Sequence, residues 1–175
     1  MTRHGPHDAR VTVFTFREGA LSAIGHDLAI EARVFSLDID DEDVTLVVDA
    51  ASLVVRAARV AGADDARALS SSDKDKIARA IADDVLHARR FAEIRATARV
   101  PEGREGRASL TLHGVTREVP FVVDRLGVDK GADTVRVTAS FAPSLFGIRP
   151  YSALLGALRV KDSVTVEIEA RAPRA

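Results

Sequence analysis

Alternation of apolar and polar residues with a period of two recurs along most of the chain, and this pattern most constrains the fold. Because successive side chains of a β-strand point to opposite faces, such alternation predicts half-buried strands. The run over residues 163–172 alternates most clearly. Its apolar face consists of Val164, Val166, Ile168 and Ala170. The pattern therefore predicts a mainly β protein.

Other segments alternate in the same way, with turn-forming residues between them. They are 11–16, 27–40, 44–55, 93–100, 108–114, 116–126 and 134–141. About eight strands of this kind are enough to close a barrel around side chains or one small ligand. Closure also removes exposed sheet edges. We therefore expect an all-β, lipocalin-like, eight-stranded antiparallel β-barrel.

Two of these strands carry further information. The segment 27–40 changes phase near Phe35 and Ser36, which indicates a bulge or bend. The segment 11–16 has apolar residues on both faces, with Val11 and Val13 opposite two phenylalanines. The pattern leaves open which of these faces points inward.

The periodicity becomes helical between residues 73 and 87. Apolar residues recur there at helical spacing, and Ser72 with Asp75 forms a capping pair. The apolar positions are Ile77, Ile81, Val85 and Leu86. We expect one long helix over residues 73–87, packed outside the barrel.

Length, net charge and cysteine content limit the classes to which the protein can belong. A chain of 175 residues fits one domain, so we expect a single domain over residues 1–175, with residues 1–9 as a frayed tail. With 25 basic and 26 acidic side chains, the net charge of −1 gives no field that would attract nucleic acid. The absence of cysteine excludes disulfides and thiolate metal sites.

The sequence shows no apolar run long enough to span a membrane and no apolar stretch near its start of the kind found in secretion signals. We therefore expect no transmembrane segment and a cytoplasmic location. Homo-oligomer formation stays open.

Histidines offer an enzymatic alternative. A metal-assisted hydrolase would use His26, Asp27 and His113, with His87 as a further ligand. The sequence has no His pair one helical turn apart and no Gly-x-Ser-x-Gly elbow. We prefer a structural interpretation, in which Gly114 supplies a positive φ at a strand turn beside His113. Hence we predict neither catalytic nor metal-binding residues.

The segment 144–162 is long, apolar and interrupted by glycine and proline, so it is expected to fold over the core as a lid or plug. It either closes one end of the core or lines the mouth of a ligand site. Arg149, Tyr151 and Lys161 are the polar groups that could meet a head group there, or they are solvated.

Four stretches in this order resemble the YceI-like family across nearly the whole chain. They are EGALSAIGHDLAIEA, DDVLHARRFAEIRATA, LTLHGVTREVPFVV and FGIRPYSALLGALRVKDSVTVEIEA. The resemblance implies a lipocalin-like barrel with a long apolar pore that accommodates a polyisoprenoid chain, such as that of an isoprenoid quinone.

We therefore expect a non-enzymatic protein that binds an apolar, isoprenoid-type lipid and needs no other cofactor. The candidate lining residues are Phe14, Phe16, Leu28, Ile30, Val48, Leu112, Phe121, Val123, Phe141 and Phe146, with Arg149 and Tyr151 near the head group. The alternative is a barrel filled by its own side chains, with residues 144–162 as an interaction surface.

Overall fold

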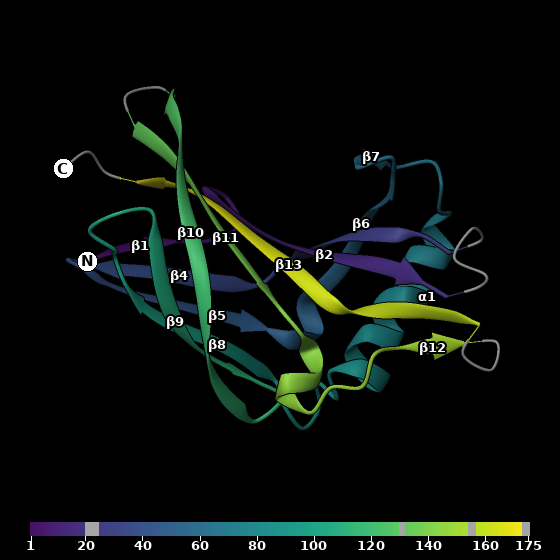
Figure 1. The fold of residues 1–175 in the computed structure, drawn as a ribbon. Helices are drawn as coiled ribbons and strands as arrows, with labels where there is room; N and C mark the ends of the chain where they lie inside the picture. Colours follow the sequence, from purple (N-terminus) through teal and green to yellow (C-terminus); the bar gives the residue numbers. More distant parts are fainter. Residues whose placement is uncertain (20–24, 130–131, 154–156, 173–175) are drawn as a thin grey trace.

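The computed structural model describes residues 1–19, 25–129, 132–153 and 157–172 (Figure 1). These residues form one antiparallel sheet of 13 strands with helical segments at one end. The first seven strands are β1 (Thr2–His4), β2 (Ala9–Glu18), β3 (Asp27–Ala32), β4 (Phe35–Asp40), β5 (Asp43–Asp49), β6 (Leu53–Val60) and β7 (Ala63–Asp65). The others are β8 (Glu93–Arg99), β9 (Glu105–Leu112), β10 (Val115–Asp129), β11 (Ala132–Phe141), β12 (Ser152–Ala153) and β13 (Leu158–Ala172).

The sheet curls round on itself. Its hydrogen-bonded order is β1-β4-β5-β8-β9-β10-β11-β13-β2-β3-β6-β7, with β12 paired to β13. Strands β4 and β5 lie near one end of this order, and β3 and β6 lie near the other. The chain connects the two ends, because β3 continues into β4 and β5 continues into β6. The prediction of a mainly β, barrel-like antiparallel fold is confirmed.

The strand count differs from the predicted eight. Strands β1, β7 and β12 are short, and the pairs β3–β4 and β5–β6 are each one long strand broken by a bend. With these strands merged and the short ones set aside, eight long strands remain. The described sheet is a curled half-barrel, whose two edges are β1 and β7, rather than an uninterrupted cylinder.

Both broken strands bend at the same corner. The expected irregularity near Phe35 lies at Arg33 and Val34, immediately before β4. There the Arg33 amide donates to the Ser52 carbonyl at 3.1 Å, and the Asp49 amide donates to the Val34 carbonyl at 3.0 Å. The corner thus keeps its backbone hydrogen bonds while the sheet changes direction.

The helical segment begins earlier than expected. Helix α1 (Ser71–Ala80) is capped by Ser70, whose hydroxyl accepts a hydrogen bond from the Asp73 amide at 3.1 Å, rather than by Ser72 with Asp75. A π-helical turn, η3 (Ile81–Val85), continues it. Figure 1 shows this segment at one end of the curled sheet, so it closes an end of the barrel instead of packing on its outside.

The expected frayed tail is also corrected. Residues 2–4 form β1, which pairs with β4, and the His4 side chain is buried beside Leu37 in the pairing register. Its Nδ1 lies 2.8 Å from a carboxylate oxygen of Asp8. The backbone hydrogen bonds to β4 order this end of the chain.

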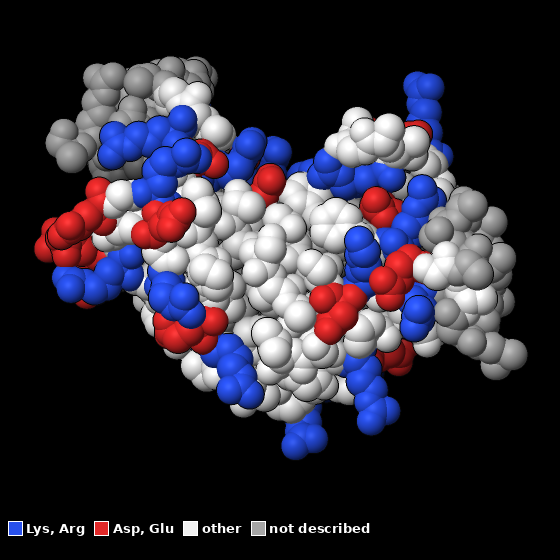
Figure 2. All heavy atoms as spheres, in the orientation of Figure 1, with Lys and Arg blue, Asp and Glu red and all other residues white. Residues whose placement is uncertain are grey.

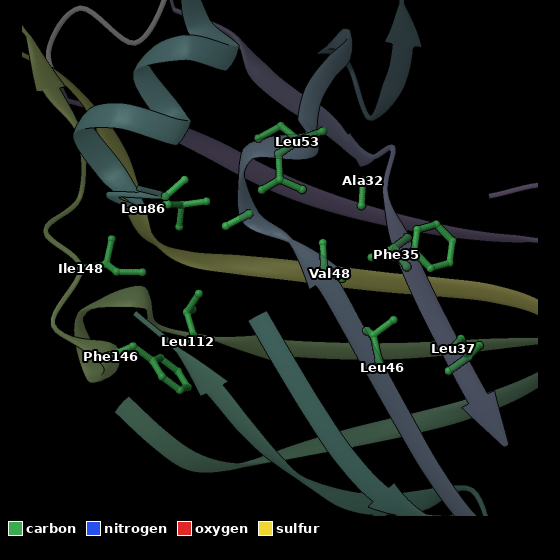
Figure 3. Packing of buried hydrophobic residues seen from close by; sticks show 14 of the residues in the cluster. Ala32, Phe35, Leu37, Leu46, Val48, Leu53, Leu86, Leu112, Phe146 and Ile148 are labelled. Carbon is green, nitrogen blue, oxygen red and sulfur yellow. The ribbon is translucent and has the colours of Figure 1, made fainter. Parts of the chain in front are cut away.

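The buried apolar side chains gather where the corner, the end of η3 and the segment after β11 meet. Figure 3 shows Leu53, Leu86, Leu112 and Ile148 directed towards this region from different elements. Phe146, in the short 3-10 helix η4 (Pro143–Phe146), has no exposed surface. Other members of the same buried cluster, such as Val11, Leu37 and Ala170, lie further along the barrel and line its interior, so the buried side chains surround a space that they do not fill.

Candidate functional site

The inward-facing side chains surround a cavity of about 1400 Å³. This volume exceeds the roughly 300–1,000 Å³ of common small-molecule sites. The sequence left open whether the barrel is hollow or filled, and the resemblance implied an apolar pore; the structure contains a hollow interior rather than the filled barrel that the interaction-module alternative requires.

The wall is apolar because each long strand contributes every second side chain to it. Four strands contribute regular inward rows to this wall, the other long strands contribute further residues, and the helical segment adds Ile77, Ile81 and Val85. The strand positions are Val11 and Val13 of β2, Val119 and Phe121 of β10, Val135, Val137 and Ala139 of β11, and Val164, Val166 and Ile168 of β13. The interior thus suits an elongated hydrocarbon more than a polar molecule.

Most of the expected lining residues lie on this wall. They are Leu28, Ile30, Val48, Leu112, Phe121, Val123 and Phe141, with Arg149 and Tyr151 at one mouth. The structure brings them together from β3, β5, β9, β10, β11 and the segment after η4. Their role in ligand binding remains a prediction.

Three expected positions are corrected. Phe14 and Phe16 lie on the outer face of β2, because Val11, Val13 and Thr15 occupy the inner face. The Arg59 guanidinium covers the Phe14 ring at 4.3 Å from its centroid.

Phe146 is the third corrected position. It lies behind the cavity wall, where its ring meets Phe141 edge-on with centroids 5.4 Å apart. It therefore supports a lining residue without itself lining the cavity.

Sequence reasoning missed the helical contribution and the smaller aliphatic residues of the wall. The inward row of β13 was visible as the clearest alternation in the sequence. The predicted lining set favoured large aromatic residues and therefore left this row out. The wall consists mainly of valine, leucine, isoleucine and alanine.

One aromatic ring of the wall depends on a glycine. Phe121 pairs with Gly106 across β10 and β9, and a Cβ at Gly106 would overlap the Phe121 ring. The ring therefore occupies the space that a side chain at position 106 would need. A glycine in a strand often marks such a close approach.

Charged groups lie at the two ends of the cavity. The strand register places Arg125, Val135 and Ala170 at one end and Arg17 with Arg159 at the other. In Figure 2, charged side chains gather towards both ends of the visible face, and uncharged residues occupy the middle. We call the first end the mixed mouth, which consists of Asp41, Arg99, Glu102, Arg104 and Arg125. The second is the basic mouth, which consists of Arg17, His26, Lys76, Arg149, Tyr151, Arg159 and Lys161.

The His113-Gly114 turn is confirmed as a strand corner. Leu112 pairs with Val115, and the two residues between them have φ of 53° and 76°. Positive φ at both positions matches the twist of the flanking strands. The Nε2 of His113 lies 2.9 Å from the Nδ1 of His87, and its ring centroid lies 4.2 Å from that of Phe91.

These surroundings disfavour the charged form of His113. Partial burial, followed by the nearby positive charge of His87, lowers the pKa of His113 below its ordinary value near 6.5. The unfolded chain therefore takes up a proton at a higher pH than the folded protein does. The contribution of the neutral His113 side chain to the stability of the folded protein is therefore complete above about pH 6.5, and it declines as the pH falls below that value.

We expect the variant His113→Asn to lose less stability between pH 7.5 and pH 5 than the unchanged protein. Asparagine tolerates positive φ, so the turn is kept while the titrating group is removed. Urea midpoints at both pH values measure the effect, with the exposed His7→Asn as control. Equal pH dependence in the unchanged protein and His113→Asn would contradict this assignment.

The hydrolase alternative gains no support from the described residues. Within residues 1–19, 25–129, 132–153 and 157–172, no three His, Asp or Glu side chains come together to hold a metal ion. His113 meets His87 and Phe91, while Asp27 accepts a hydrogen bond from the Arg17 amide at 2.8 Å. In the same described part, no helix has the length and apolar character needed to cross a membrane.

Comparison with solved structures finds similar folds at low sequence identity. Burkholderia cenocepacia BcnA is 15% identical, with a TM-score of 0.57, covering 94% of this chain and 96% of its own. A polyisoprenoid binding domain from Saccharophagus degradans is 14% identical, with a TM-score of 0.57 and 94% of each chain covered. The Campylobacter jejuni YCEI protein is 14% identical, with a TM-score of 0.56, covering 83% of this chain and 84% of its own.

Comparison with curated proteins finds no match. The family model of the YceI-like domain matches residues 8–172, which include all the long strands and the whole described cavity wall. The chain therefore belongs to the YceI-like family.

Proposed function

We propose that this protein binds an apolar, isoprenoid-type lipid in its interior cavity and performs no covalent chemistry. The observation that carries the proposal is the cavity of about 1400 Å³, whose wall is aliphatic along most of its length. A flexible hydrocarbon chain fits such a wall because burial of apolar surface needs no directional contacts. The Saccharophagus degradans domain, described as binding polyisoprenoids, supports this ligand class.

Burial of hydrocarbon is sufficient for useful affinity. Each buried methylene contributes about 0.8 kcal/mol, so roughly ten of them approach the 8 kcal/mol of a micromolar complex. The loss of chain flexibility on binding offsets part of this gain. A tail of several isoprene units therefore supplies the required free energy without a specific polar contact.

We expect protein purified without detergent to carry an isoprenoid lipid or, once stripped of lipid, to take up geranylgeraniol as a one-to-one complex. Native mass spectrometry measures the uptake, and mass spectrometry of an organic extract identifies any lipid already bound. Folded, lipid-free protein that takes up neither geranylgeraniol nor its phosphate would contradict the proposed function. A cytoplasmic location remains a prediction from the sequence.

A further inference from the structure

The contact between His87 and His113 joins two elements that border the cavity. His113 directly follows Leu112, at the β9–β10 turn, and His87 directly follows Leu86, at the end of the helical segment. Both leucines are buried and line the cavity. Figure 3 shows them directed towards the same region from different elements. The two histidines therefore connect the elements whose leucines bound this part of the cavity.

The geometry of the histidine pair places one proton between the rings. The Nδ1 of His87 and the Nε2 of His113 lie 2.9 Å apart, so one nitrogen donates and the other accepts. The Nδ1 of His113 is directed to η4, where the backbone of Phe146 favours a proton on this ring. Neutral His113 therefore keeps its proton on Nδ1, and its Nε2 accepts from His87.

Double protonation is incompatible with this contact. A single added proton leaves one acceptor between the rings, so the hydrogen bond survives. When both imidazoles are charged, two N–H groups face each other across the 2.9 Å that separates the nitrogens, with no acceptor between them. The two positive charges also repel each other. The doubly charged rings must therefore move apart.

The surroundings do not compensate for this repulsion. Besides His87, the charged group that acts on His113 is the guanidinium of Arg90. Among the described residues, no carboxylate forms an ion pair or a hydrogen bond with either ring. Burial, together with these cations, lowers the pKa of His113, so the pair stays closed at neutral pH.

The elements around the pair carry charges of both signs. These charged residues are Asp83 and Asp84 on η3, Arg89, Arg90 and Glu93 after it, Arg117 and Glu118 on β10, and Asp162 beside η4. Glu93 and Glu118 form ion pairs with arginines, and Asp162 accepts hydrogen bonds from Ser144. The acids of η3 are exposed to solvent, which weakens their effect on the rings.

We propose that the histidine pair is a pH-sensitive switch, which keeps this part of the cavity closed near neutral pH and opens it in mild acid. This inference rests on the proposed function, since the switch regulates the same cavity. Separation of the rings moves the β9–β10 turn away from the helical segment, and with it Leu112 from Leu86. The φ of 48° at His87 and 53° at His113 adds backbone strain that favours the release.

The test measures the affinity for geranylgeraniol, which has no titrating group, at pH 7.5 and pH 5.0. We expect the unchanged protein to bind it about fivefold more weakly at the lower pH. In His87→Asn and in His113→Asn, the ratio should fall below about twofold, because one histidine is gone while asparagine tolerates the positive φ. The matched control is His26→Asn, which removes a histidine from the basic mouth and should keep the full ratio.

Hydrogen exchange of the lipid-free protein provides a second measurement that needs no ligand. Protection factors, which are corrected for the intrinsic effect of pH, should fall in residues 86–91 and 110–117 between pH 7.5 and pH 5.0. Those of β13 should stay constant, because the switch opens the structure only locally.

Each outcome separates the switch from the proposed function. Equal affinity of the unchanged protein at the two pH values overturns the switch but leaves lipid binding intact. Full pH dependence in both asparagine variants overturns it as well. An equal loss of protection in β13 also does so, because acid would then loosen the whole barrel. Absence of uptake at pH 7.5 contradicts the proposed function itself, and constant protection at residues 86–91 and 110–117 contradicts the switch alone.

Discussion

Replacing Ala139 with Trp is expected to lower the affinity for geranylgeraniol at least tenfold, which corresponds to about 1.4 kcal/mol. Ala139 lies on the inner face of β11, half-buried in the cavity wall and opposite Val166 of β13. An indole at this position would project into the space that the hydrocarbon occupies. Titration with the prenyl alcohol, followed by native mass spectrometry, measures the loss.

The neighbouring position provides the matched control. Ser140 is exposed, and its hydroxyl meets that of Thr165 at 2.9 Å on the outer face. The variant Ser140→Trp adds the same side chain to the same strand but leaves the cavity unchanged, so it should bind the alcohol normally. Equal affinities for Ala139→Trp and Ser140→Trp, with both proteins folded, would show that the cavity does not hold the ligand.

The strands were predictable because alternation reports which residues share a face. The clearest run, 163–172, lies within β13, and its predicted apolar face contributes Val164, Val166 and Ile168 to the wall. The corner between β3 and β4 was visible as a change of phase, although the break lies one or two residues earlier. Local pattern therefore indicated both the strands and the point at which one of them bends.

Alternation could not predict which face of β2 points inward, because both faces of this strand carry apolar residues. In the structure, Phe14 is buried on the outer face beside Ala29, its partner in the register, beneath the guanidinium of Arg59. A large ring over a small residue is protected from water without facing the cavity. This arrangement depends on β3 and β6, so β2 alone contains no signal for it.

The position of the helix was unpredictable for a related reason. The spacing of Ile77, Ile81 and Val85 indicates one apolar face but not the surface that it meets. The structure turns this face into the cavity, at the end where the basic mouth lies. The pairing of His113 with His87 likewise arises only when the β9–β10 turn reaches the end of the helical segment.

Gly114→Ala is expected to reduce stability by about 2–3 kcal/mol, because it combines two costs. The residue has φ of 76°, and a Cβ there would lie 2.8 Å from Cε1 of Phe91. The Phe91 ring has little room to move, since the His113 ring lies at 4.2 Å and the Arg90 guanidinium at 5.0 Å from its centroid.

Two other glycines separate these costs. Gly62 has φ of 80° but nothing within 4 Å of an added Cβ, so Gly62→Ala measures the backbone cost alone, about 1–2 kcal/mol. Gly103 has neither feature, and Gly103→Ala should change stability by less than about 0.5 kcal/mol. Thermal unfolding should rank Gly114→Ala lowest, then Gly62→Ala, then Gly103→Ala, at roughly 2–4 °C per kcal/mol. Equal melting temperatures for Gly114→Ala and Gly62→Ala would show that the Phe91 ring moves aside without a cost in stability. The His113-Gly114 turn would then require glycine only because of its positive φ.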